Sequence, residues 1–103
     1  MNEMERVRQW LEAGRQVGKW LSFLRDGEAY CLSIGVQKWQ GSYKLQLVEY
    51  PDDLSYDTES TREEQLSFPS FEALEQFFST VPTVSLAELA PLKGRKIFTP
   101  GSW

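Results

Sequence analysis

Apolar residues near the N-terminus recur at helical spacing. Met4, Val7 and Leu11 lie three and four residues apart, which places them on one face of a helix. Gly14 follows where such a helix would end, because glycine adopts the left-handed backbone of a C-terminal cap at little cost. The pattern predicts an amphipathic helix over residues 3–13.

From Val17 onward the apolar period changes to two, and two dipeptides suited to tight turns interrupt it. Asp26-Gly27 fits a two-residue hairpin turn because both positions tolerate positive φ, and Gln40-Gly41 is a second candidate. Counting outward from both turns predicts three strands, over residues 16–25, 28–39 and 42–50.

The two turns predict the same register independently. Val36 faces Val17 across the first turn and Leu45 across the second, so the core side of the middle strand meets apolar residues twice. A slip of one residue would send every side chain to the opposite face. The agreement therefore favours an antiparallel three-strand meander with one apolar face.

The second half of the chain adds a strand and a helix. Residues 51–62 lack periodicity and are interpreted as a polar loop, followed by a short fourth strand over residues 63–68. Ser70 is the expected N-cap of a helix over residues 71–80 with one apolar stripe. A capping-box spacing predicts a short helical turn near residues 86–90.

These elements predict one α+β domain over residues 1–103, with helices packed on an antiparallel sheet. The segment Lys96–Thr99 is interpreted either as a last short strand or as an extended tail. No uninterrupted apolar run exceeds the four residues Ala29–Leu32, so we expect no membrane span and no export signal. With a lone thiol, the expected compartment is the reducing cytoplasm.

The side-chain inventory removes most familiar catalytic sites. The chain has no histidine and one cysteine, Cys31, so it cannot form a zinc site, a cysteine–histidine pair or an intrachain disulfide. We predict no catalytic residues, no metal site and no cofactor. Cys31 lies in the middle of a predicted strand and is interpreted as a structural thiol.

The net charge of −4 conceals an uneven distribution along the chain. Residues 49–92 carry ten acidic side chains against Arg62 alone, whereas both ends are mildly basic. The loop carboxylates could in principle bind Ca²⁺ or Mg²⁺, but their spacing specifies no site, and a solvated loop is the favoured interpretation. A concentrated negative field would also speed docking of a basic protein.

Aromatic residues mark the sheet face opposite the predicted core. In the predicted register Trp20, Trp39 and Tyr50 lie at the margins of this face, with small residues between them. Such a surface suits a packed partner, because small residues allow close approach while Trp and Tyr supply contact area. Two alternatives stay open: the N-terminal helix covers this face with its apolar residues, or the face is partly open and binds a partner.

The favoured function is a non-enzymatic cytoplasmic protein-binding module of the inhibitor, immunity or adaptor type. It would use the acidic segment 49–64 and the sheet aromatics, with a basic protein as partner and a homodimer as an open option. The predicted partner-binding residues are Asp52, Asp53, Asp57, Glu59, Trp20, Trp39 and Tyr50.

Two other classes of function are retained as alternatives. A binder of a small ligand or of single-stranded nucleic acid would use the same aromatic face, although the acidic segment opposes binding of polyanions. A carboxylate-dependent hydrolase would need two facing acidic groups, and the candidates are Glu49, Asp52, Glu63 and Glu64.

Overall fold

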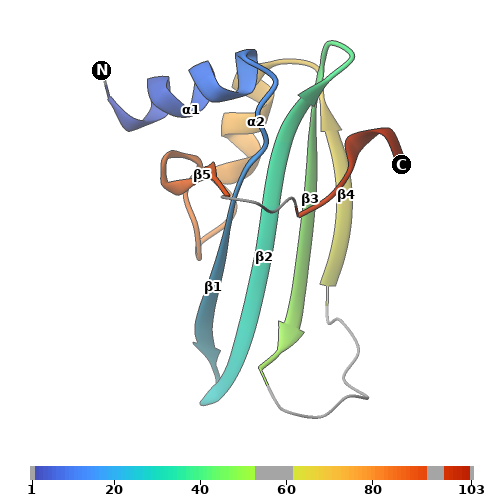
Figure 1. Cartoon of the computed structure of the whole chain (residues 1–103). Helices are drawn as coiled ribbons and strands as arrows, with labels where there is room; N and C mark the ends of the chain where they lie inside the picture. Colours follow the sequence, from blue (N-terminus) through green and yellow to red (C-terminus); the bar gives the residue numbers. More distant parts are fainter. Residues whose placement is uncertain (1, 53–61, 93–96, 103) are drawn as a thin grey trace.

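The computed structural model of the chain describes residues 2–52, 62–92 and 97–102. The fold is α+β, with two α-helices and a five-stranded antiparallel sheet in the order β4-β3-β2-β1-β5 (Figure 1). The elements are α1 (Glu3–Glu12), β1 (Val17–Arg25), β2 (Glu28–Trp39), β3 (Ser42–Pro51), β4 (Arg62–Phe68), α2 (Phe71–Phe78), the 3-10 turn η1 (Leu86–Glu88), β5 (Ala90–Pro91) and the 3-10 turn η2 (Pro100–Ser102).

The predicted meander and its register are confirmed. Val36 pairs with Val17 on β1 and with Leu45 on β3, as the two turns required. Asp26 and Gly27 have φ values of 52° and 82°, and Gln40 and Gly41 have φ values of 51° and 81°. Both connections are therefore two-residue turns of the type whose twist matches that of the flanking strands.

Both helices begin where the sequence predicts, at capping residues, and both end earlier than predicted. The Ser70 Oγ accepts a hydrogen bond from the Ala73 amide at 3.1 Å, so α2 begins as expected. However, α2 ends at Phe78, two residues before the predicted end, because the Ser79 and Thr80 hydroxyls bond back to carbonyls of the last turn.

The predicted turn over residues 86–90 is also too long. Only residues Leu86–Glu88 form a 3-10 turn, which the Glu88 carboxylate caps by accepting from the Ser85 amide at 2.6 Å. Ala90 and Pro91 then form β5 and pair with Gly18 and Val17 at the edge of β1.

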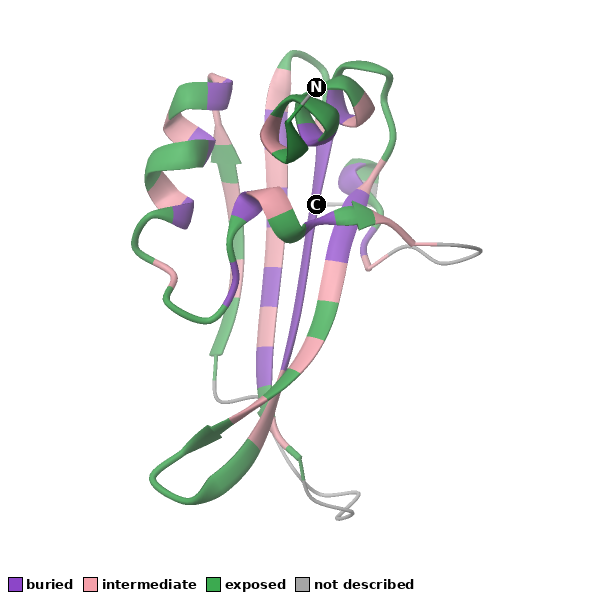
Figure 2. Cartoon of the chain, turned by 90° about the vertical axis from the view of Figure 1, so that its left-hand side faces the viewer, coloured by how far each residue is buried: buried purple, intermediate pink, exposed green. Residues whose placement is uncertain are grey.

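The hydrophobic core lies on one face of the sheet, which we call the first face. Its fully buried strand residues are Val17, Ile34, Val36, Leu45 and Leu47. These residues pack with Val7 and Leu11 of α1 and with Leu74 and Phe78 of α2. Figure 2 shows the buried residues gathered where the helices lie, whereas the end of the β1–β2 hairpin is exposed.

Both helices therefore cover the first face, and the alternative that placed α1 on the opposite face is wrong. The end of α1 is tied to the first face because Glu12 accepts hydrogen bonds from Lys38 Nζ at 2.7 Å and from the Tyr43 hydroxyl. Arg8 of α1 also stacks over the Phe71 ring of α2, 5.1 Å from its centroid. These polar contacts favour packing of α1 on the first face over packing on the second.

The Tyr43 hydroxyl gives the fold a testable dependence on pH. Burial, reinforced by the hydrogen bond to Glu12, raises the pKa of Tyr43 to about 12. Between pH 10 and 12 the folded state thus holds a proton that the unfolded state loses, so this contribution is present below pH 10 and is lost as the pH rises. We expect the free energy of unfolding of the wild type, measured in urea, to fall relative to that of Tyr43→Phe across this window. A constant difference between the two proteins would contradict this assignment.

Candidate functional site

The second face of the sheet carries the candidate site. No α-helix of the described ranges lies on it. Instead the C-terminal residues Ile97–Gly101, which we call the strap, cross this face opposite the helices (Figure 1). The strap is not a strand over residues 97–99, so of the two interpretations of this segment the extended tail is the one observed there.

Gln16 anchors the strap to the start of β1. Its Oε1 accepts hydrogen bonds from the amides of Ile97 at 2.6 Å and Phe98 at 3.4 Å, and its Nε2 donates to the Phe98 carbonyl at 2.7 Å. The same Nε2 donates to Gln37 Oε1 at 2.9 Å. Gln37, itself buried, donates to the Gly14 carbonyl at 3.1 Å. One amide side chain thus fixes backbone separated from it by some eighty residues.

Two glycines explain where the strap lies. A side-chain carbon at Gly18 would lie 2.6 Å from Ile97 Cδ1, and one at Gly35 would lie 3.0 Å from Ile97 Cβ. These two positions face each other on β1 and β2. Their missing side chains form a shallow notch that Ile97 fills, because any larger residue would overlap it.

Between the strap and the β1–β2 turn, the second face presents an aromatic patch. We define this patch as Trp20, Leu24, Val48 and Tyr50 with the small residues between them. Trp20 is 48% exposed, Leu24 75% and Tyr50 39%. Together with Trp39 these three are the four large hydrophobic residues that stand exposed in the described part of the chain. All four have the strand parity of the second face. Such segregation to one face is typical of a contact surface rather than of scattered surface residues.

Hydrogen bonds hold parts of the patch in place. The Trp20 indole N–H donates to Ser33 Oγ at 2.8 Å across β1 and β2. Ser22 Oγ lies 3.8 Å from Cys31 Sγ on the same face. Burial, together with the neighbouring Cys31 thiol, raises the pKa of Tyr50, so its ring is a neutral contact surface at physiological pH.

The structure divides the predicted aromatic site in two. Trp20 and Tyr50 lie together in the aromatic patch, as predicted from the register. Trp39 lies against the end of the strap, where a side-chain carbon at Gly101 would come within 3.2 Å of its ring. Trp39 is therefore separate from the patch. The strand pattern could not show this, because it does not indicate that the C-terminal segment lies against Trp39.

The acidic residues of the candidate site lie only partly within the described chain. Asp52 is exposed directly after β3, and Glu63 is exposed on β4 opposite Val48. Both border the aromatic patch. Predicted site residues Asp53, Asp57 and Glu59 lie outside the described residues.

Three of the four candidate carboxylates of a hydrolase, Glu49, Glu63 and Glu64, are divided between the two faces of the sheet. Glu49 is buried on the first face, where its two carboxylate oxygens accept from Arg25 at 2.7 and 3.1 Å. Glu64 shares that face and accepts from Arg62 at 2.8 Å, whereas Glu63 projects from the second face. A buried carboxylate held by arginine is a structural ion pair, because the guanidinium stabilises its charged form.

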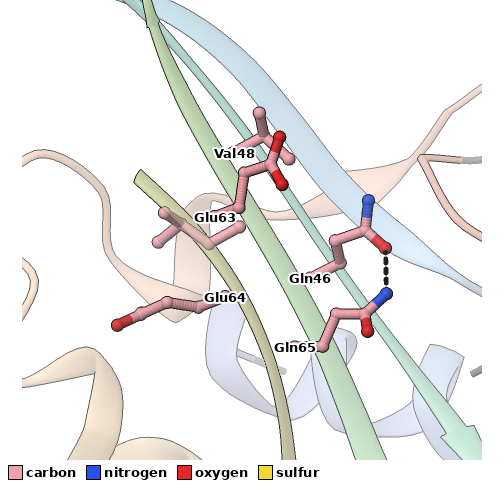
Figure 3. Close-up of a pocket in the computed structure, with 6 residues that line it drawn as sticks. Gln46, Val48, Glu63, Glu64 and Gln65 are labelled. Atoms are coloured by element: carbon pink, nitrogen blue, oxygen red, sulfur yellow. Dashed lines mark hydrogen bonds between the residues drawn. The ribbon is translucent and has the colours of Figure 1, made fainter. Parts of the chain in front are cut away.

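An open hollow of about 330 Å³ lies beside the patch between β3 and β4. Figure 3 shows Val48, Glu63, Gln46 and Gln65 around it, with a hydrogen bond of 3.3 Å from Gln65 Nε2 to Gln46 Oε1. Its lining combines two apolar residues, Leu47 and Val48, with two amides and the carboxylates of Glu63 and Glu64. It extends the patch with polar groups.

Comparisons with known proteins give no assignment. The chain matches no protein-family model, and no curated protein or solved structure shows a significant similarity to it. Within residues 2–52, 62–92 and 97–102, no group of three or more metal-ligating side chains gathers. In the same ranges no helix has the length and apolar character needed to cross a membrane.

Proposed function

We propose that this chain is a non-enzymatic protein-binding module of the cytoplasm, and that the aromatic patch is its docking surface. The observation that carries the proposal is the segregation of every exposed large hydrophobic residue of the described chain to the second face. Aromatic residues at the centre of an interface supply much of its binding energy.

The charges around the patch indicate the chemistry of the partner. Asp52 borders the patch beside Tyr50, where its amide donates to the Ala29 carbonyl of β2, and Glu63 borders it on β4 and also lines the neighbouring hollow. A partner that fits would present an apolar side chain flanked by lysine or arginine. Opposite charges at the rim of an interface raise the association rate more than the affinity.

A photo-crosslinking experiment tests the surface directly. A benzophenone amino acid replaces Val48 in the patch, and in a matched control it replaces Gln76, which is exposed on α2. We expect a discrete protein adduct in cells from the Val48 position alone, because only that side chain lies in the proposed interface. The adduct should be lost when Trp20 and Tyr50 are both replaced by serine.

The affinity of the captured partner provides the quantitative check. Loss of two interface aromatics should weaken binding at least roughly thirtyfold, as for interface residues worth about 2 kcal/mol. Asp52→Asn should instead slow association and reduce its dependence on salt. Identical adducts from Val48 and Gln76, or binding that survives the double aromatic variant, would contradict the proposal. A tryptophan fluorescence response to oligonucleotides without any protein adduct would favour the nucleic-acid alternative.

A further inference from the structure

The two edges of the sheet differ in how they are covered. On one side β5 pairs only with Val17 and Gly18, although β1 continues for seven more residues to Arg25. Along residues 19–25, β1 has β2 on one side and no other described strand on its outer side. This length of β1 is an exposed edge, and an exposed edge offers a template for pairing with another strand.

The tight turn determines which backbone groups point outward from this edge. Arg25 and Glu28 flank the two-residue turn at Asp26-Gly27, and residues in that position exchange hydrogen bonds with each other. Odd-numbered residues of β1 therefore bond to β2, and even-numbered residues direct their amides and carbonyls outward. The pairing of Gly18 with Ala90 of β5 agrees with this assignment. Ser22 and Leu24 thus present backbone groups to the open side.

The side chains along this edge lack the usual protection against pairing. Residues 20–24 read Trp-Leu-Ser-Phe-Leu, with no charge and no proline, and the register with β2 runs through them without a bulge. The opposite edge strand β4 instead begins with three consecutive charged residues, 62–64. Charged residues, prolines and bulges are the common means by which edge strands avoid association, and apolar stretches without them favour it.

We propose that the β1 edge pairs antiparallel with the β1 edge of a second copy of this chain. The pairing is centred on Ser22, which lies opposite its own counterpart. Leu24 then faces Trp20 of the second copy, and Leu21 faces Phe23. Shifting the centre to Phe23 would place Leu24 opposite Ser22, so the register centred on Ser22 buries more apolar surface.

Charge does not oppose this pairing. Lys19 would face Arg25 of the second copy, but each already has an acidic partner within its own chain. Lys19 lies 3.2 Å from Glu88, and Arg25 lies 2.7 Å from Glu49. The four groups together are neutral, so the like charges at the ends of the paired strands are compensated.

The pairing also closes the assembly at two copies. Each copy contributes the same edge of β1, so the contact is the same patch on both subunits, and a two-fold axis satisfies it completely. The two sheets become continuous, and Leu24 of one copy extends the aromatic patch of the other. This inference does not depend on the proposed function, because it concerns the strand edge and not the occupant of the second face.

Sedimentation of the full chain tests the oligomeric state. We expect the wild type to sediment at twice its monomer mass of 11.9 kDa, and Leu24→Lys to sediment as a monomer. Leu24 is 75% exposed, so the substitution leaves the core intact. Gln65→Lys is the matched control, because it adds the same charge to the exposed second face of β4 at the opposite edge. A wild type that is monomeric at concentrations of about 100 µM, or a Leu24→Lys variant that stays dimeric, would overturn the proposal.

Disulfide trapping tests the register. Ser22→Cys is introduced together with Cys31→Ser, because Cys31 Sγ lies only 3.8 Å from Ser22 Oγ and would otherwise capture the new thiol. Directly opposed residues on antiparallel strands have Cα atoms about 5.5 Å apart, within the range that a disulfide spans. Oxidation should therefore link two copies covalently, whereas Ser67→Cys in the same background should yield no linked dimer. Equal linkage at both positions would overturn the proposed register.

Discussion

Replacing Leu47 by alanine is expected to destabilise the protein by about 2–5 kcal/mol. Leu47 is fully buried on the first face of β3, among residues of β2 and the helix-covered core. The substitution removes apolar contacts and leaves a cavity that close-packed neighbours fill only in part. Since a domain of this size has a free energy of unfolding of about 5–15 kcal/mol, the loss is a large share of the total.

Val48 supplies a matched control one residue away. It projects from the second face, is only half-buried, and faces Ser33 and Glu63 on the neighbouring strands. Val48→Ala removes little buried surface and should cost about 1 kcal/mol or less. Urea denaturation of both variants measures the two free energies. Equal losses for the two adjacent residues would mean that the assignment of the faces is wrong.

The faces themselves were predictable because two local signals constrain one strand. Each tight turn fixes the register on its own side of β2, and Val36 meets an apolar residue under both. Because side chains alternate strictly between the two faces of a strand, each side chain points to one face or the other. Agreement between the turns therefore determines the direction of every side chain on the strand. The exposure of Trp20 and Tyr50 on one face follows from the same argument.

The side on which α1 packs could not be predicted in this way. The apolar stripe of α1, which includes Val7 and Leu11, would suit either face of a sheet, because hydrophobic burial is not directional. What separates the two arrangements is a set of polar contacts between distant segments. Glu12 reaches Lys38 and Tyr43 on the first face. No spacing within the helix indicates such partners.

Very short elements and long-range contacts were also beyond prediction. The two residues of β5 are too few to show any periodicity, and they form a strand only by pairing with Val17 and Gly18 of β1. The sequence pattern predicts that small residues of the second face, Gly35 among them, leave space for a partner. Part of that space is instead filled by Ile97 of the same chain. A glycine in a strand indicates that another segment approaches the backbone closely, but it does not indicate which segment that is.

The notch beneath the strap leads to a second prediction of large effect. Gly18→Ala is expected to destabilise the protein by about 1–3 kcal/mol, as overpacking of a tight site does. The added carbon would lie 2.6 Å from the Ile34 carbonyl oxygen as well as 2.6 Å from Ile97 Cδ1. The carbonyl belongs to the paired strand β2 and cannot move away without disturbing the sheet. The effect is measured as the loss in free energy of unfolding in urea.

Gly35→Ala is the control that separates the strap from the sheet. The three atoms nearest to its added carbon would all belong to Ile97, at 3.0 to 3.3 Å. Ile97→Gly removes all three of these atoms. The loss of stability caused by Gly35→Ala should therefore be much smaller when it is measured in the Ile97→Gly background than in the wild type. The same second substitution should rescue Gly18→Ala only in part, because the contact with the Ile34 carbonyl persists. Equal rescue at both positions would contradict a strap seated on these two glycines, since coupling between two substitutions reports direct contact.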